Sequence, residues 1–271
     1  MSEHVTDAAG VEHAPAGADA RIVSLVPSIT ELLFALGLDA QIVGRTGFCV
    51  HPREKVHSVP KVGGTKSVQI DAIRALRPTH LIVNIDENTL PTVDALRAFV
   101  PHIVVTHPQA PADNLALYDL LGTIFGRQHD AQRLRAALQA RLGEAAARSW
   151  PAQRVLYVIW REPWMTVASN TYIAAMLRLV NWHTLPAVDG GAAGAARYPV
   201  FDFEGPWLAD VDRVLLSSEP YRFTQNHCDA LAKDPRLAGK RVELIDGEQV
   251  SWYGSRAIDG IGYLQDFAVR G

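Results

Sequence analysis

An uninterrupted helical stretch near the middle of the chain constrains the fold more than any other feature. Between Asp130 and Ser149 the only glycine or proline is Gly143, and Leu134, Leu138 and Leu142 recur every four positions. A helix of roughly twenty residues spans about 30 Å, the width of a small domain. The Trp-Pro pair that follows ends it, because proline disfavours helical backbone in the residue before it. We therefore expect one long helix, over residues 127–150, with separate structure on either side.

Strand-like and helix-like segments alternate on both sides of this helix. Short apolar runs rich in β-branched residues predict strands, and apolar residues at a spacing of three or four predict the helices between them. The expected strands cover residues 21–26, 80–85 and 102–106 before the long helix, and 154–160, 214–216 and 241–245 after it. This order is typical of an α/β protein with two β/α lobes joined by a single long backbone helix.

The predicted organisation thus has four parts. Residues 1–20 offer no apolar periodicity and are expected to form a disordered N-terminal tail. An N-terminal β/α lobe over 21–126, the backbone helix over 127–150 and a C-terminal β/α lobe over 151–271 follow. The segment 189–197, rich in glycine and alanine, is expected to be a loop of the second lobe.

Composition excludes several classes of partner and location. The formal net charge of −3 provides no basic field for nucleic acid. Membrane insertion is not expected, because no apolar run reaches the length of about 18 residues that a transmembrane helix needs. The first residues lack the basic-then-apolar order of a secretory signal. As written, the chain is expected to be cytoplasmic, or periplasmic if a signal has been removed, and to be a monomer.

Motifs that would indicate an enzyme or a nucleotide site are absent or incomplete. In the stretch 63–67, Thr65 separates Gly64 from Lys66, and Val59 occupies the position of the first glycine of a phosphate-binding loop. No Gly-x-Ser-x-Gly or His-Glu-x-x-His pattern occurs. The Cys-x-His and His-Cys pairs supply too few ligands for a tetrahedral zinc site. These absences favour binding over catalysis.

Aromatic and bulky polar side chains gather instead in the predicted loops between strands and helices. In α/β proteins such loops commonly bind ligands. Trp160 and Phe201 also fit a core position, whereas rings and a guanidinium at 252–256 are costly to expose without a partner. The residues of interest are Phe48, His51, Trp160, Trp164, Tyr198, Phe201, Trp252, Tyr253 and Arg256.

Four stretches carry a resemblance to a known family: 21–31, Val62-Gly63-Gly64, Trp160-Arg161-Glu162-Pro163 and Ser251-Trp252-Tyr253-Gly254-Ser255-Arg256. Together with the long helix, they resemble the helical-backbone (class III) substrate-binding proteins of ABC importers, in their cobalamin-binding, BtuF-like branch. The resemblance implies two lobes joined by a rigid helix, a ligand cleft between the lobes, and an ABC permease as partner.

The resemblance also assigns positions, with departures. Phe48 and His51 stand where a cobalamin binder places a tyrosine, Lys66 lies near the place of a cleft tryptophan, and Tyr198 falls close to another. These departures leave room for a different corrinoid, a haem-like macrocycle or an anionic iron chelate. Asp71 and Glu204 are similar in position to an acidic pair that docks on permease arginines, although acidic residues at helix starts are also common for helix-dipole reasons.

The leading hypothesis is a non-catalytic binding protein for cobalamin, another corrinoid or a similar metal chelate, with no cofactor of its own. The rings of such a site would stack on the ligand, the charged groups would meet its polar parts, and His51 could also ligate its metal. Two alternatives remain open: a chelatase-like enzyme that uses His51, Glu162 and His183, and a cytoplasmic corrinoid or siderophore carrier. The expected ligand-binding residues are Phe48, His51, Lys66, Trp160, Tyr198, Trp252, Tyr253 and Arg256.

Overall fold

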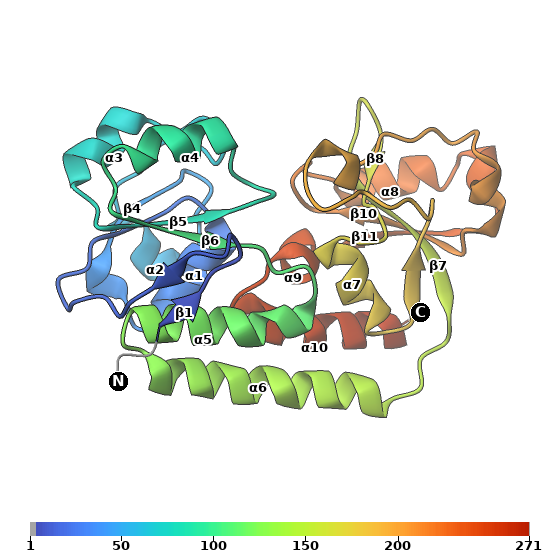
Figure 1. Ribbon diagram of the computed structural model, residues 1–271. Helices are drawn as coiled ribbons and strands as arrows, with labels where there is room; N and C mark the ends of the chain where they lie inside the picture. Colours follow the sequence, from blue (N-terminus) through green and yellow to red (C-terminus); the bar gives the residue numbers. More distant parts are fainter. Residues whose placement is uncertain (1–3, 271) are drawn as a thin grey trace. The chain divides into compact units, whose positions relative to one another are not determined.

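The computed structural model describes residues 4–270, which divide into two compact units, each with its own sheet (Figure 1). The first unit contains the chain up to Pro108, together with Asp113–Leu138 and Tyr253–Arg256. The second contains Gln109–Ala112, Gln139–Trp252 and the chain from Ala257. The boundary inside the middle of the chain falls within helix α6 (Gln128–Ala147), which confirms the long helix. The α/β class with two lobes is likewise confirmed.

The sheet of the first unit is fully parallel, in the order β4-β3-β5-β6. Every residue of β3 and β5 is buried, as expected for a parallel sheet covered on both faces. The strands are β3 (Ile22–Ser24), β4 (Ile42–Arg45), β5 (His80–Asn84) and β6 (His102–Thr106), and the helices are α1 (Pro27–Ala35), α2 (Arg53–Val56), α3 (Ile70–Leu76), α4 (Leu90–Arg97) and α5 (Asn114–Ile124).

The core between this sheet and helices α3 and α4 is aliphatic. Ile73 from α3 and Val93 and Leu96 from α4 pack with Val23 and Leu81 of the strands. Figure 1 shows both helices on the same face of the sheet. This packing positions the loops that leave the carboxyl ends of the strands.

The predicted disordered tail over residues 1–20 is wrong for its described part. Strands β1 (Val5–Thr6) and β2 (Glu12–His13) pair as an antiparallel hairpin. The buried Asp7 carboxylate accepts a hydrogen bond from Val105 N at 2.9 Å and lies 3.0 Å from His13 Nε2. Residues 1–3 lie outside the described range. Buried polar contacts fix this hairpin, so apolar periodicity gave no signal for it.

The sheet of the second unit is mixed, in the order β11-β10-β7-β8, with β9 also paired to β7. Strands β7, β9, β10 and β11 are parallel, and β8 alone is antiparallel. Neither β8 nor β9 was predicted, because strands of two and three residues are too short to show a period. The strands are β7 (Gln153–Trp160), β8 (Met165–Thr166), β9 (Trp182–Thr184), β10 (Arg213–Ser217) and β11 (Arg241–Ile245).

The helices of the second unit lie between these strands or after the last of them in the chain. They are α7 (Tyr172–Arg178), α8 (Gln225–Leu231), α9 (Gly247–Ser251) and α10 (Arg256–Val269), whose first residue belongs to the first unit. Short 3₁₀ turns in the two units cover Asp39–Gln41, Pro111–Asp113, Ala195–Arg197, Pro206–Asp210 and Pro235–Leu237. The stretch 189–197 forms no strand and only the 3₁₀ turn at its end, so the loop expectation holds.

Aromatic rings fill much of the second unit's core. Trp164 stacks parallel to Phe223 at 6.1 Å between ring centroids and meets Phe203 edge-on at 5.4 Å. Phe201 meets Phe203 edge-on at 5.2 Å and is itself buried. The core interpretation of Phe201 is therefore the one that the structure supports, and Trp164 packs against the same cluster.

Candidate binding surfaces at the carboxyl ends of the strands

In the first unit, the candidate residues lie in loops that follow the carboxyl ends of the strands. Phe48 and His51 come after β4, and Lys66 lies in the loop before α3. Asp86 and Glu87 follow β5, and His107 follows β6. Ligands of parallel α/β sheets commonly bind at this edge. Sequence reasoning missed the last three of these residues, because their signal is only their position directly after a strand.

Phe48 is the most exposed aromatic side chain at this edge, with 63% of its surface accessible. Its loop is bonded to the neighbouring one, because Gly47 N donates to Gly63 O at 2.7 Å. A side chain at Gly64 would crowd the Phe48 ring, since a Cβ there would lie 3.3 Å from Cε2. Lys66 is exposed in the turn that Gly64 N closes on Ser67 O at 2.9 Å. An exposed ring and an ammonium thus lie on two hydrogen-bonded loops.

Hydrogen bonds from the buried Arg45 side chain fix the loop that carries Phe48 and His51. This buried guanidinium donates to three backbone carbonyls: Nε to Val56 O at 2.8 Å, and Nη1 to Thr46 O at 3.1 Å and Cys49 O at 3.0 Å. The Cys49 thiol is buried beside the Thr46 hydroxyl, and burial raises its pKa. Both residues support the loop from inside the protein, so the exposed ring is presented on a rigid base.

A second loop of this edge is also internally bonded. Asn88 Nδ2 donates to Thr65 O at 3.0 Å and to Leu25 O at 3.3 Å, and thereby connects the loop after β5 to the Lys66 turn. His107 Nε2 lies 3.4 Å from Asp86 Oδ2. Acidic and imidazole groups therefore lie at the same edge as Phe48, which gives it polar as well as apolar character.

The segment 253–256 belongs to the first unit and is bonded to it along its length. The Tyr253 hydroxyl donates to Glu87 Oε1. Gly254 N donates to Asn114 Oδ1 at 2.6 Å, and Gly254 O accepts from the Tyr118 hydroxyl at 2.8 Å.

Arg256, at the end of this segment, makes a two-bond contact with Glu31, from Nε at 2.9 Å and Nη2 at 2.6 Å. Tyr253 is only 8% exposed. The structure thus gives Tyr253 and Arg256 bonds within the protein, and their contact with ligand stays a prediction.

In the second unit, β7 ends in an exposed tryptophan. Trp160 is 39% exposed, and its ring meets that of Tyr221 edge-on at 5.6 Å. Tyr221 follows β10 in the chain, and its N donates to Ile159 O at 3.3 Å. Tyr198 is half-buried in the loop after the Ala195–Arg197 turn. Of the two interpretations of Trp160, the structure favours the exposed one, and it adds Tyr221, which sequence reasoning missed.

Trp252 occupies a more enclosed place in this unit. It is 8% exposed, and its Nε1 donates to Glu219 Oε1 at 2.8 Å, the same oxygen that accepts from Ser251 Oγ at 2.7 Å. Burial raises the pKa of Glu219, and the two donors oppose that rise. The indole N–H is therefore already bonded inside the unit, and a stacking role for Trp252 remains a prediction.

The acidic residues expected to dock on a permease differ in their surroundings. Asp71 is exposed in the first turn of α3. Glu204 is exposed in a turn two residues before the 3₁₀ helix Pro206–Asp210, and its Oε1 accepts from Arg236 Nη1 at 2.7 Å. Docking by either residue stays a prediction.

The residues of the chelatase alternative are not assembled within the second unit. Glu162 follows the carboxyl end of β7, whereas His183 pairs in register with Arg154 at the amino end of the same strand. In the part of the chain that the structure describes, no group of three or more His, Cys, Asp or Glu side chains is arranged to hold a metal ion. Glu162 and His183 therefore lie at opposite ends of β7, and the expectation that they act together in one catalytic site is wrong.

Comparison with known proteins identifies the protein family of this chain. The chain belongs to the periplasmic binding protein family, whose profile matches residues 22–239. It is 22% identical over 256 residues to an uncharacterized ABC transporter substrate-binding lipoprotein of Bacillus subtilis (strain 168), a match that covers 91% of this chain and 79% of the relative. The resemblance to substrate-binding proteins of ABC importers is thereby confirmed.

More particular likenesses involve tetrapyrrole-binding proteins. A vitamin B12-binding protein of Yersinia pestis (strain Pestoides F) is 27% identical over 176 residues, and the match covers 61% of this chain and 59% of that relative. The periplasmic haem-binding protein RhuT of Roseiflexus sp. RS-1 has the same fold, with a TM-score of 0.76 at 23% identity over 93% of this chain and 97% of that one. The vitamin B12-binding protein BtuF of Vibrio cholerae also scores 0.76, at 19% identity over 92% and 96% of the two chains.

The family consists of binding proteins, and a small-molecule ligand and an ABC permease are the partners that membership implies. Among residues 4–270, no helix combines the length and apolar character needed to cross a bilayer.

Proposed function

We propose that this chain is the substrate-binding protein of an ABC importer and that its cargo is a metal tetrapyrrole, either a corrinoid such as cobalamin or a haem. A relative in sequence is named as a vitamin B12-binding protein, and proteins of the same fold are named as haem-binding and vitamin B12-binding proteins. The observation that carries the proposal is the exposed Phe48 ring, which lies on a braced loop at the carboxyl edge of a parallel sheet. An exposed ring of this kind offers a face for a flat ligand.

The groups near Phe48 match the other parts of such a ligand. Lys66 is exposed on the adjoining turn and would meet an anionic substituent, such as a carboxylate or a phosphate. His51, three residues after Phe48 in the same loop, offers an imidazole of the kind that ligates iron and cobalt. A metal tetrapyrrole combines a flat face, polar substituents and an axial metal position, and this loop pair provides one group for each.

In the second unit, the proposed ligand surface consists of Trp160, Tyr221 and Tyr198. The first two rings already contact each other, so a ligand would meet them as one aromatic surface. Trp252, Tyr253 and Arg256, which are bonded within their units, would support the surfaces more than stack on the ligand.

Ligand titration tests the function. We expect the purified chain to bind haemin or cyanocobalamin saturably and one-to-one, measured by tryptophan quenching and calorimetry, with cobinamide and a ferric siderophore as further probes. Phe48→Ala should weaken binding at least tenfold, about 1.4 kcal/mol. Val269→Ala is the control, because Val269 has a similar exposed fraction of 58% and lies at the end of α10. Silence from both tetrapyrroles would contradict the proposal, and metal insertion into a free porphyrin would favour a chelatase.

The role of His51 has its own readout. With haemin as the probe, His51→Ala should shift the visible absorption bands of the complex, because removal of an axial imidazole changes the ligand field of the iron. His57→Ala, in an exposed histidine after α2, is the matched control. Identical spectra of the two variants would limit His51 to polar contact with the ligand.

Docking on a permease is tested separately from ligand binding. Asp71→Lys and Glu204→Lys should lower ligand uptake in cells that carry the permease while leaving the ligand affinity of the purified protein unchanged. The effect of Asp71→Lys should be the larger, because Glu204 is already paired with Arg236. Normal uptake by the double variant would remove both residues from the docking surface.

A further inference from the structure

A hollow opens at the amino ends of the strands in the second unit, at the edge opposite to its candidate binding surface. Strands β7, β9, β10 and β11 begin at Gln153, Trp182, Arg213 and Arg241, and because they are parallel these starts share one edge. The hollow has a volume of about 580 Å³. That volume lies within the range of small-molecule sites, roughly 300–1,000 Å³. Nothing in the proposed import function uses this edge.

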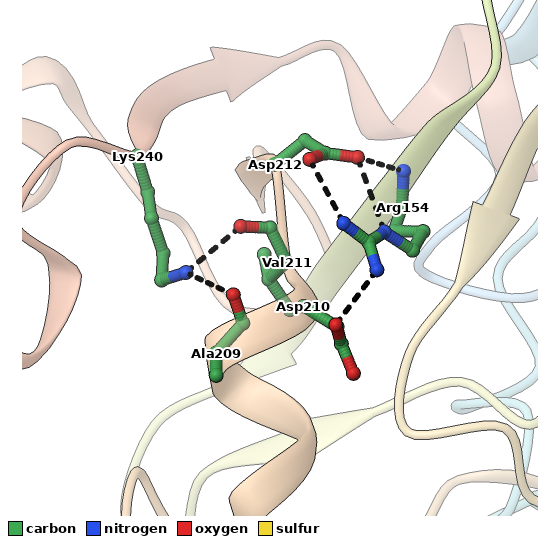
Figure 2. Close-up of polar contacts among 6 residues, drawn as sticks. All are labelled: Arg154, Ala209, Asp210, Val211, Asp212 and Lys240. Carbon is green, nitrogen blue, oxygen red and sulfur yellow. Dashed lines mark hydrogen bonds and ion pairs between the residues drawn. The ribbon is translucent and has the colours of Figure 1, made fainter.

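The charged side chains that line the hollow are mostly cationic. Arg213, Lys240 and Arg241 face a single acidic residue, Asp212. Asp212 is itself paired with Arg154, which is outside the lining: Oδ2 accepts from Arg154 N at 2.7 Å, and Oδ1 lies 3.5 Å from Nη2 (Figure 2). The pairing holds the pKa of Asp212 below its usual value, mainly through the backbone bond from Arg154. The carboxylate is thus occupied, and the cations define the electrostatic character of the hollow.

Arg213 is a buried cation with incomplete hydrogen bonding. Its side chain is 3% exposed, and Nη1 donates to Glu243 Oε2 at 2.8 Å. The guanidinium carbon lies 4.7 Å from the centroid of the Trp182 ring. Within residues 4–270, Nε has no hydrogen-bond partner. A buried guanidinium with an unmade hydrogen bond is destabilising, and a nearby anion would offset that cost.

Lys240 places an ammonium at the same wall. Nζ donates to Val211 O at 2.9 Å and to Ala209 O at 3.3 Å, as Figure 2 shows. These two bonds fix the position of the group, and an ammonium has three hydrogens, so one more acceptor can bind. Trp150 adds a half-buried aromatic wall beside it.

From this arrangement we propose that the hollow is a second binding site, for a small organic anion whose carboxylate or phosphate meets Lys240 and Arg241 beside the buried Arg213. The apolar body of the anion lies against Trp150. The site is separate from the proposed cargo surface and does not depend on it. Two arms of the test distinguish a carboxylate from a phosphate.

Calorimetry on the full chain, at constant ionic strength, tests this site with benzoate and phenyl phosphate as probes. They share an aromatic body and differ in the anionic group, so the tighter binder identifies the preferred chemistry. We expect at least one probe to bind saturably with a Kd of about 1 mM or below. Arg241→Gln and Lys240→Gln should each weaken that binding at least tenfold, while Lys233→Gln, an exposed lysine that does not line the hollow, should leave it unchanged.

Two further variants locate the binding. Tryptophan fluorescence should change when the probe binds, and Trp150→Phe should reduce that change, to which Trp182 in the lining also contributes. Phe48→Ala should leave probe affinity unaltered, even if cargo binding is lost. Arg241 is exposed, so its variant keeps the test valid if Lys240→Gln disturbs the fold. Absence of saturation with both probes, or equal affinity in the Arg241→Gln and Lys233→Gln variants, would overturn the proposal.

Discussion

The two core clusters next to the candidate surfaces differ in their content of aromatic side chains. In the first, the buried core under α3 and α4 is built from Val, Leu and Ile, with Phe99 packed against it, and Phe48 is exposed at the edge of the sheet. In the second, Phe201, Phe203 and Phe223 fill the core, and Trp164, Trp207 and Tyr221 pack against them. An aromatic residue in a loop therefore indicates a ligand surface only where the adjoining core does not need the ring.

Each unit contains a group whose pKa is shifted by burial, and the two shifts act on stability in opposite directions. In the first, His80 is buried at the start of β5, where its ring stacks on that of His102 at 4.8 Å. Burial, with the nearby His102 and His13, lowers the pKa of His80 to about 4. In the second, the carboxyl group of Glu219 has its pKa raised by burial. The contributions of His80 and Glu219 to stability should therefore change with pH in opposite directions.

The largest predicted difference comes from removing the same side chain in each unit. Phe223→Ala should lower the free energy of unfolding by about 3–5 kcal/mol, because a buried ring leaves a cavity. Phe48→Ala should change it by less than about 0.5 kcal/mol, since the ring is exposed. Urea denaturation followed by circular dichroism measures both values. Equal losses in the two variants would show that Phe48 belongs to a core and would break the contrast.

A smaller effect is expected from acid in the first unit. The ordinary histidine pKa is 6.5 and that of folded His80 is about 4, so the unfolded chain takes up the proton first as pH falls. The free energy of unfolding is therefore highest above pH 6.5, where His80 is neutral in both states, and it decreases as the pH falls toward 4. Between pH 7 and pH 5 the loss is about 2 kcal/mol.

His80→Gln removes the titrating ring and should make this pH dependence shallower. Hydrogen exchange of the β5 and β6 amides, measured at both pH values, reports on the first unit alone. His129→Gln, in an exposed histidine of α6, is the matched control. A slope in His80→Gln as steep as that of the parent protein would refute the assignment.

The smallest effect is expected in the second unit, where two donors to Glu219 partly oppose the rise of its pKa. A carboxyl group with a raised pKa in the folded state stabilises the fold while it is protonated, so stability falls as pH rises from the ordinary carboxyl value through the raised one. Glu219→Gln keeps an oxygen acceptor for Ser251 and Trp252 but cannot ionise. Exchange of the β10 amides should therefore depend less on pH in this variant. Exchange of the β10 amides in Glu219→Gln that depends on pH as strongly as in the parent protein would contradict the role assigned to Glu219.

Most of the regular structure could be predicted because it rests on local patterns. Strand β6 has the expected bounds, 102–106, because it is a short, mostly apolar and β-branched run. Strand β11 also has its expected bounds, 241–245, where Val242, Leu244 and Ile245 stand among charged residues. The long helix was equally visible, since about twenty residues without a proline leave few alternatives.

Polar networks between distant residues could not be predicted in the same way. The contact of Asp7 with Val105 and that of Arg256 with Glu31 join residues far apart in sequence, and neither has a periodic signature. For the candidate surfaces, Phe48 and Trp160 were identified because aromatic residues stand out in loops. Arg45 and Tyr221 were missed. The hydrogen bonds of Arg45 to its loop and the contact of Tyr221 with the Trp160 ring depend on packing in three dimensions.

The segment 253–256 affects how the protein is made. Glu31, Asn114 and Tyr118 are translated before Gly254 and Arg256, to which they bond, and the separations are 136 to 225 residues. The first unit therefore cannot complete its hydrogen bonding until residues 253–256 have left the ribosome. A nascent chain stalled before this point would leave the Glu31 carboxylate, the Asn114 amide oxygen and the Tyr118 hydroxyl without these partners.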